Sequence, residues 1–460
     1  MQKSGDSPRI KKLKEGARKI SIQEGAIATV QSGFGDSYIT PYAIALNASN
    51  AEIGFLASIP GLLGPISQWF SSRLIEKSSR KKIVLFALLL QGLMWLPIIL
   101  LSYLFYKGIF TGTLPVLLIV FFSVYIVFGN IAGPAWFSWM GDIVDEKNRG
   151  KYFSKRNRIA GIVSLLCMLI AAYSLDFFKR HSIVLVGFSI LFFLAMSARL
   201  ISRLMFKKQY EPRIKLEKGY YFTFWQFLKK APSNNFGKFA IFRSFMSFAT
   251  SIAGPFFAVY MLRNLNFSYI TYVFVALSPT VFSLLIMPLW GKFSDKYGNY
   301  KTIKITSFLI PLLPLLWIVS GSPFYLFFVP EMISGIAWAG FNLASGNFIY
   351  DSVTPQKRGV CVAYYNLLHG MGVFLGASLG AILVKYISTS PIIWVFVISA
   401  IVRALVSFIG ISKIKEVREV EKFDGNRAFK NLVIKTMRYP AEGVHELFAL
   451  KKLKKAVLNI

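Results

Sequence analysis

Runs of about 20 apolar residues recur along the whole chain and are separated by short polar segments. Each run is long enough to cross a hydrocarbon layer ~30 Å thick as a helix. The runs lack the apolar–polar alternation of membrane-barrel strands, and a helix satisfies its own backbone hydrogen bonds in lipid. The pattern therefore predicts an all-α integral membrane protein with twelve spans. Their approximate cores are residues 22–46, 52–72, 83–105, 114–140, 158–178, 183–205, 238–262, 269–290, 303–320, 324–349, 360–386 and 391–411.

The distribution of basic residues predicts how these spans are oriented. The chain is 55% hydrophobic and has a formal net charge of +32. Lys and Arg gather before the first span and after the second and fourth spans, whereas the connections after spans 1, 3 and 9 together hold only Lys107. Cytoplasmic loops of membrane proteins carry such an excess. We therefore expect a multi-pass protein of the plasma membrane with both termini in the cytoplasm, and no binding of nucleic acid.

The same pattern divides the chain into five segments. They are a basic tail (1–19), a first half of six spans (20–205), a basic central loop (206–237), a second half of six spans (238–411) and a basic tail (412–460). Residues 220–230 predict a helix in the membrane interface, and residues 450–458 have the pattern of an amphipathic surface helix. We expect the basic loops and tail to attract anionic lipid, and the protein to be a monomer.

Polar segments of the two halves repeat each other. The segment after span 2 (72–81) aligns without gaps with the segment after span 8 (291–300). The segments after spans 4 and 10 share an Asp, six intervening residues and Arg-Gly. A repeat of six spans in the same sense predicts two halves related by an axis along the membrane normal, with a cavity between them. The residues that carry the repeat, interpreted as parts of a cytoplasmic gate, are Glu76, Arg80, Asp142, Arg149, Gly150, Gly291, Asp295, Lys296, Gly298, Asp351, Arg358 and Gly359.

The segment after span 8 resembles the signature of a known family. Its sequence from Gly291 to Gly298 is similar to the Gly-x-Leu-Ala-Asp-Arg-x-Gly-Arg-Arg loop of the major facilitator superfamily. Asn299 and Tyr300 depart from the basic end of that loop, and serines replace both glycines in the first-half copy. The resemblance covers about residues 20–411. It implies a bundle of two six-helix halves, alternating-access transport, and a cavity lined by spans 1, 4, 7 and 10.

A gating role for the loop can be argued from its charges. Asp295 can interact with the positive N-terminus of a neighbouring helix, and it can also pair with Arg358 before span 11. Such contacts need the cytoplasmic ends to be close, so they would favour an outward-open state. The alternative is that these loops only turn tightly and keep charge in the cytoplasm. We favour gating for Asp295, and for Glu76 the two interpretations are even.

Ionisable groups within the spans are the candidates for ion coupling. At bilayer depth each such group costs at least ~2.5 kcal/mol unless it has a partner, a proton or water. We predict that Asp36 in span 1 and Glu331 in span 10 couple transport to a proton or cation. A structural hydrogen bond to a neighbouring helix is the alternative for Asp36. His369 in span 11 either carries a proton or packs as a neutral imidazole.

Other polar and aromatic residues are candidates for the cavity wall or for structural roles. Those expected to offer hydrogen bonds and stacking surfaces, with packing as the alternative for each, are Gln31, Tyr38, Asn130, Trp136, Trp338 and Asn342. Arg199 and Arg403 occupy matching places in spans 6 and 12, which suggests a shared structural role. Arg243 in span 7 is expected to extend toward the cytoplasm. Glycines at four-residue spacing from Gly372 to Gly380 predict close helix packing.

The function predicted from these features is secondary active transport of a small solute, coupled to protons through Asp36 or Glu331. The sequence has no Walker loop, no HExxH motif or other cluster of metal ligands, and no nucleophile elbow. We therefore expect no cofactor, no metal and no enzymatic activity. The alternatives are an uncoupled facilitator of the same fold and a transporter-like receptor or scaffold. Neither the solute nor the direction of transport follows from the sequence.

Overall fold

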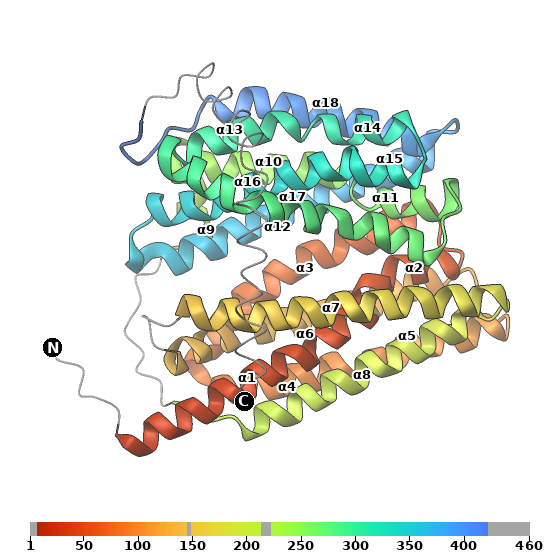
Figure 1. Cartoon of the computed structure of the whole chain (residues 1–460), viewed down its shortest axis with the longest axis horizontal. Coiled ribbons are helices and arrows are strands. Elements are labelled where there is room, and N and C mark those ends of the chain that lie inside the picture. Colours follow the sequence, from red (N-terminus) through yellow and green to blue (C-terminus); the bar gives the residue numbers. More distant parts are fainter. Residues whose placement is uncertain (1–6, 145–148, 213–221, 422–460) are drawn as a thin grey trace, which may run out of the picture.

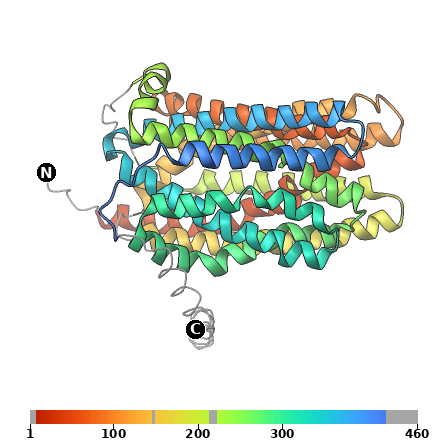
Figure 2. The same cartoon turned by 90° about the horizontal axis from the view of Figure 1, so that it is seen from above.

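The computed structural model describes residues 7–144, 149–212 and 222–421, which form a bundle of long helices running along one direction (Figure 1 and Figure 2). The first half contains α1 (Pro8–Phe34), η1 (Asp36–Tyr38), α2 (Ile39–Ala45), α3 (Asn50–Lys77), α4 (Arg80–Leu93), α5 (Trp95–Tyr106), α6 (Leu114–Ile143), α7 (Arg149–Arg180) and α8 (Val184–Lys208). The connection holds α9 (Phe224–Lys230) and η3 (Ala231–Ser233). The second half contains α10 (Asn235–Ala253), α11 (Phe256–Val259), η4 (Tyr260–Asn264), α12 (Tyr269–Tyr297), α13 (Asn299–Leu309), α14 (Leu312–Val319), α15 (Pro323–Phe328), α16 (Pro330–Ser352), α17 (Pro355–Tyr386) and α18 (Pro391–Ile411).

These helices confirm the predicted bundle of two six-helix halves. Within the described residues, eleven helices or runs of helices are long and apolar enough to cross a membrane. The remaining span is α1 with η1 and α2, which is too polar to qualify by hydropathy but packs along α7 and α8. α1 begins at Pro8, before the expected core at residue 22, and the Ser7 hydroxyl caps its N-terminus.

Five spans are interrupted where the sequence analysis treats them as continuous. The interruptions lie between α1 and η1, α4 and α5, α10 and α11, α13 and α14, and α15 and α16. Pro255, Pro311 and Pro330 stand at three of them, because proline cannot donate the helical hydrogen bond and its ring clashes with the preceding turn. Such breaks leave backbone groups available inside the membrane.

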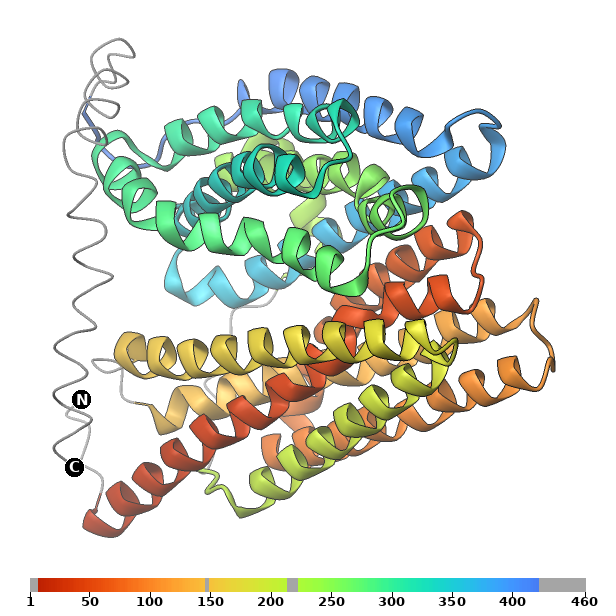
Figure 3. The same cartoon turned by 45° about the vertical axis from the view of Figure 1, so that its right-hand side comes forward.

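The two halves share a core at one end of the bundle only. We call the end with the α3–α4 and α12–α13 connections the basic end, which lies at the left of Figure 1, and the other end the far end. At the far end one apolar cluster joins both halves, including Tyr42 and Phe188 from the first and Phe256 and Val395 from the second. At the basic end each half has its own cluster of buried residues, and among the described residues Trp69 of α3 is the one first-half side chain that packs against the second-half cluster. Figure 3 shows the two sets of helices diverging toward the basic end.

The longest contact between the halves runs between α3 and α17. The Ser58 and Ser378 hydroxyls are 2.6 Å apart, and Ser58 also donates to the carbonyl of Phe374 at 3.0 Å. A Cβ on Gly54 would lie 2.6 Å from that of Ala381, so small residues set the approach of the two helices. On another face of α17, the glycines from Gly372 to Gly380 pack against the backbone of α10, as predicted.

Polar contacts between the halves also gather at the far end. Asp176 of α7 accepts hydrogen bonds from the backbone N–H groups of Tyr269 (2.7 Å) and Ile270 (2.9 Å), which begin α12. A carboxylate at that position both satisfies free N–H groups and opposes the positive end of the helix dipole. Arg263 of η4 donates to the Asn50 side chain at 2.6 Å and to a carbonyl in the α2–α3 turn.

The segments outside the spans cover the basic end. A helix forms within the expected interfacial region, where Phe227 of α9 packs on Phe236 and Tyr364 while Trp225 is exposed. Residues 412–421, which we call the strap, follow α18 across the basic end of the second half. The predicted surface helix at 450–458 lies outside the described residues. Contact of these segments with lipid stays a prediction.

Candidate functional site

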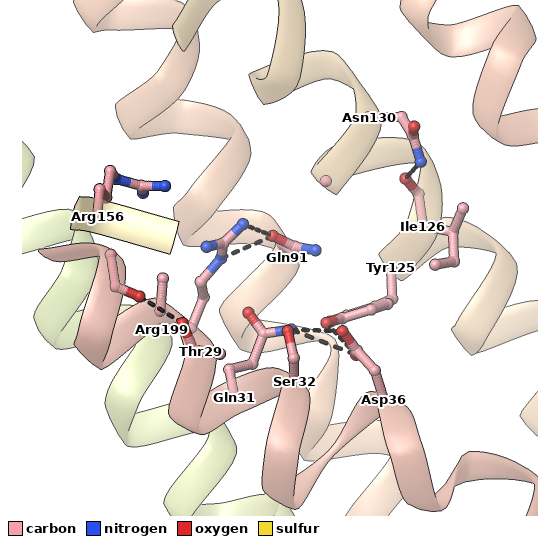
Figure 4. Close-up of a pocket in the computed structure, with 13 residues that line it drawn as sticks. Thr29, Gln31, Ser32, Asp36, Gln91, Tyr125, Ile126, Asn130, Arg156 and Arg199 are labelled. Carbon is pink, nitrogen blue, oxygen red and sulfur yellow. Dashed lines mark hydrogen bonds between the residues drawn. The ribbon is translucent and has the colours of Figure 1, made fainter. Parts of the chain in front are cut away.

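The first half contains an open cavity of about 360 Å³ with a polar lining (Figure 4). The side chains that supply most of its hydrogen-bonding groups are Gln31, Asp36, Gln91, Tyr125, Asn130 and Arg199. They come from the first, third, fourth and sixth spans. Gln31, Asp36 and Asn130 were expected from the sequence to serve the cavity or ion coupling, and the structure brings them together.

Asp36 occupies the break in the first span. The Tyr125 hydroxyl donates to its Oδ1 atom at 2.5 Å, and the Gln31 side-chain amide donates to the same atom at 3.3 Å. Gly35 makes this geometry possible, because a Cβ there would lie 2.5 Å from the Trp95 ring. The side-chain hydrogen-bond partners of the carboxylate, Tyr125, Gln31 and Ser32, are all neutral donors. Asp36 can therefore accept a proton without dissolving an ion pair.

Two arginines face the same cavity and differ in their partners. Arg156 pairs with Glu24 at 3.2 Å, and its guanidinium lies 4.6 Å from the centre of the Trp136 ring. Arg199 donates through Nε to the Gln91 side-chain oxygen at 2.7 Å, and Nη2 contacts the same atom. The Arg199 guanidinium is thus held by the neutral side-chain amide of Gln91.

A larger cavity of about 590 Å³ is lined mainly by residues of the second half, together with Ala57 of α3 from the first half. Its wall is more aromatic and apolar, with Phe257, Tyr272, Trp317 and Trp338 among its residues. Glu331 lines the same space from the first turn of α16, directly after the break at Val329, and the Trp317 side chain is its hydrogen-bond partner. Asp36 and Glu331 therefore share one arrangement: each is a carboxylate at a helix break, beside a cavity and near neutral donors.

Arg199 and Arg403 each line one of these cavities, but they are held differently. Arg403 is fully buried and donates to the carbonyls of Ile310 and Thr250, both at 3.3 Å, and to the Ser399 hydroxyl at 3.0 Å. Ile310 marks the break between α13 and α14. Arg403 therefore adds a donor to backbone carbonyls next to two helix breaks, whereas Arg199 contacts a side chain.

The remaining predicted cavity residues lie in several surroundings. Tyr38 is fully buried and donates to the carbonyl of Met168. Trp136 forms the platform under Arg156, and Asn342 is exposed and lines neither cavity. His369 is near the Arg243 guanidinium, outside both linings.

Sequence reasoning missed Gln91, Tyr125 and Trp317 as cavity residues and placed Arg199 among structural groups. Gln91 is the one of these with a usable signal, since it is an amide inside an apolar run. No group of three or more His, Cys, Asp or Glu that could hold a metal ion occurs among the described residues.

At the basic end of the first half, the buried Arg80 side chain is the centre of an ion network. Its Nη1 atom donates to Asp142 at 2.7 Å and to the carbonyl of Ser138 at 2.9 Å. Glu211, which follows α8, accepts from the Ser79 hydroxyl at 2.6 Å and from the backbone N–H of Lys81 at 3.2 Å. The network ties the start of α4 to the end of α6 and to the segment after the sixth span.

The second half builds the same network with one exchange. Asn299 aligns with Arg80, and its amide donates to Asp351 at 2.7 Å. The positive charge comes from the strap, where Nε of Arg418 lies 3.2 Å from the Asp351 carboxylate. Glu416 accepts from the backbone N–H of Tyr300 at 2.8 Å, as Glu211 does from Lys81. Asn299 departs from the family pattern because Arg418 takes over its charge.

Among the described side chains, the contacts of the other predicted gate residues lie within the second half and its strap. Asp295 is exposed, while Arg358 donates to the carbonyls of Tyr350 and Val353. Lys296 pairs with Glu421 of the strap at 3.4 Å. Gly298 is required by its positive φ of 93°, whereas a Cβ on Gly291 or Gly359 would meet nothing within 4 Å. The side chains at Glu76, Arg149 and Gly150 lie outside the described part.

Comparison with known proteins shows which family this chain belongs to. A family model described as Major Facilitator Superfamily matches residues 25–245 and 239–456. Riboflavin transporter RibZ of Clostridioides difficile is 29% identical over 136 residues, which are 29% of each chain. An uncharacterized MFS-type transporter of Bacillus subtilis, YfiU, is 28% identical over 135 residues, 29% of this chain and 26% of that one. The matched region thus spans less than a third of these curated relatives.

Solved structures resemble nearly the whole described bundle. The nucleoside transporter NupG superposes with a TM-score of 0.62 at 16% identity, covering 87% of this chain and 98% of that one. A bacterial homologue of the iron transporter ferroportin, in an inward-facing state, gives a TM-score of 0.64 at 13% identity with the same coverages. At these identities the likeness shows the fold alone.

Proposed function

The chain belongs to the Major Facilitator Superfamily and is a membrane transporter of that type, and from this premise we propose that it moves a small solute by proton-coupled alternating access. The basic end would lie in the cytoplasm and the far end outside the plasma membrane, as the positive-inside rule suggests. Relatives named for riboflavin and nucleosides make small organic solutes the reasonable class to test.

The observation that carries the proposal is the uneven contact between the halves. One core, the Ser58–Ser378 contact and the Asp176 cap close the far end, while each half keeps its own core at the basic end. In this proposal the structure represents a cytoplasm-open state. Alternating access then requires the far-end contacts to open as the two networks at the basic end approach each other.

Proton coupling is supported by the surroundings of the two carboxylates. An unpaired carboxylate inside a membrane bundle is expensive unless it gains a proton or water. Asp36 and Glu331 have neutral donors as partners, and each lines a cavity. Protonation turns a carboxylate oxygen from an acceptor into a donor, so a proton would change what Tyr125 and Trp317 can bond. Proton binding would therefore change the hydrogen bonds at the two helix breaks directly.

Alternating access can be tested by locking the far end. In a background with Cys167→Ser and Cys361→Ser, the pair Ser58→Cys and Ser378→Cys should form a disulfide, and Ser334→Cys reports access to the second cavity. We expect a membrane-impermeant maleimide to label the oxidised protein from the cytoplasmic side only. Reduction should add labelling from outside.

The matched control carries Ser58→Cys without its partner and cannot form the lock. Labelling of the oxidised pair from outside would show that the far end is not the closed gate. Absence of outside labelling in the reduced protein would contradict alternating access.

Proton coupling needs a transported solute, which thermal-shift screening with riboflavin, nucleosides and hexoses can supply, since a ligand stabilises the state it binds. In proteoliposomes, a pH gradient should drive uptake of the hit against its concentration. Asp36→Asn and Glu331→Gln should each lower the pH-driven component. Equal flux with and without a gradient would identify an uncoupled facilitator instead. Unchanged pH-driven flux in both variants would remove these carboxylates from the coupling.

A further inference from the structure

Arg243 of α10 is a charged side chain within the second half, and the described part of the chain gives it no acidic partner. Its guanidinium lies 5.1 Å from the centre of the Phe341 ring and 5.9 Å from that of Trp338. Its Nη1 atom donates to the Ser247 hydroxyl at 3.1 Å, and its Nε atom is buried with no hydrogen-bond partner. Among the described residues, no carboxylate lies within 4.0 Å of it, whereas Arg156 of the first half is paired with Glu24.

The position of the guanidinium contradicts the expectation that Arg243 extends toward the cytoplasm. Phe341 and Trp338 stand eleven and fourteen residues before Ser352, where α16 ends at the basic end. At 1.5 Å per residue, the two rings lie roughly 16 and 21 Å above that end. The arginine therefore points along the rings into the membrane region. A cation at this depth requires compensation by a partner or by water.

The chemistry of the site matches an anion with a flat apolar body. A guanidinium has five N–H donors in a planar fork that fits a carboxylate or a phosphate, and one of them is used by Ser247. His369 of α17 lies close enough to Arg243 to interact electrostatically. Trp338 faces the arginine and also lines the second cavity of about 590 Å³. An anion on Arg243 would thus extend its body over Trp338 into that cavity.

We propose that Arg243, with the rings of Trp338 and Phe341 and with His369 beside it, binds the anionic group of the transported solute, so that the substrate class is an organic acid or phosphate with a flat apolar body. This inference rests on the proposed transport function. The carboxylate of Glu331 lies at the other end of the same cavity, seven residues before Trp338. Arg243 adjoins the cavity at Trp338, so the anion would bind beside the cavity, with the protonatable Glu331 farther along α16 toward the far end.

The test compares probes of one shape and different charge. The full chain is purified in a non-ionic detergent, and its thermal stability is measured with benzoate, phenyl phosphate, benzamide and benzylammonium. We expect stabilisation by benzoate or phenyl phosphate and none by benzamide or benzylammonium. Arg243→Gln should weaken anion binding roughly 10- to 100-fold, since charge-assisted hydrogen bonds are lost. Arg243→Lys should bind with intermediate strength, because it keeps the charge without the fork.

A matched control is Arg203→Gln, which removes an arginine that donates to the Leu85 carbonyl in the other half and should bind the anions as the wild type does. If neither anion stabilises the wild type more than benzamide, the assignment is wrong, even if Arg243→Gln fails to fold. It is equally overturned if Arg199→Gln, rather than Arg243→Gln, abolishes the effect. Stabilisation by phosphatidylglycerol alone, lost in Arg243→Gln, would assign the site to a lipid headgroup and overturn the solute proposal.

These measurements separate this inference from the transport proposal. Binding in detergent needs neither a membrane gradient nor movement between states. Anion binding through Arg243 without any flux in liposomes would contradict transport and leave the anion site standing. Flux of a neutral solute that is unaffected by Arg243→Gln would support transport and contradict the anion site.

Discussion

In the second half the strap, rather than the α12–α13 connection, supplies the positive charge to Asp351. This difference can be tested by placing an arginine at position 299. In the first half Arg80 binds Asp142, whereas in the second half Asn299 occupies the matching position and Arg418 supplies the cation to Asp351. Removing Arg418 should therefore destabilise the basic end of the second half. An arginine introduced at position 299 should restore part of that loss.

The expected magnitude follows from the exposure and contacts of Arg418. The side chains of Arg418 and Asp351 are 34% and 23% exposed, so solvent screening limits the ion pair to below ~1 kcal/mol. Arg418 also donates to the carbonyl of Ser294 at 3.0 Å, a hydrogen bond from a charged group worth roughly another 1 kcal/mol. Arg418→Ala should then cost about 1–2 kcal/mol in total. For a half of about 200 residues, that corresponds to a fall of roughly 2–8 °C in Tm.

The assay is thermal unfolding of four proteins in detergent: the wild type, Arg418→Ala, Asn299→Arg and the double variant. The double variant should regain about half or more of the loss, a coupling of ~0.5–1 kcal/mol between the two positions. Lys413→Ala is the matched control, since it removes an exposed cation from the same strap and should leave Tm unchanged. A double variant no more stable than Arg418→Ala would refute the equivalence of the two networks.

Three further substitutions test other parts of the structure. Gly298→Ala should cost about 1–2 kcal/mol, because φ is 93° and the new Cβ would meet the Glu416 carboxylate, and the change is measured as a lower Tm. Gly35→Leu should lower Tm by overpacking against Trp95, at a cost of roughly 1–3 kcal/mol, and an unchanged Tm would show that the first span can move aside. Asp176→Ala should weaken the far-end contact between the halves by about 1 kcal/mol, because the N-terminus of α12 loses its cap. The expected readout is slower disulfide formation in the Ser58→Cys and Ser378→Cys pair. Equal rates would show that Asp176 does not hold the halves together.

The helices and the repeat were largely predictable from the sequence. Hydropathy and run length act locally along the chain, so each span could be placed without knowing its neighbours. The sequence alignment of the segments after spans 2 and 8 is equally local, and it pairs Arg80 with Asn299 without knowledge of any contact. What the alignment could not supply was the role of Arg418, because it lies in another segment and reaches Asp351 only through the fold.

The candidate site was predictable only in part. Asp36 and Glu331 stand out because a charge in an apolar run is expensive, and that signal is local. Their partners are not local: Tyr125 lies 89 residues from Asp36 along the chain. Arg243 shows the limit most clearly, since its side chain is long enough to reach the surface, and only the positions of Trp338 and Phe341 decide that it does not.

The sequence alone determined that the protein crosses the membrane many times, that its two halves repeat, and that Asp36 and Glu331 lie within apolar runs. The tertiary structure alone decided which end is closed, where the spans break, and which cation lacks an anion. The physical reason is that burial in lipid depends on composition along one helix. The partners of a buried charge, and the state of a gate, depend on how separate helices pack against one another.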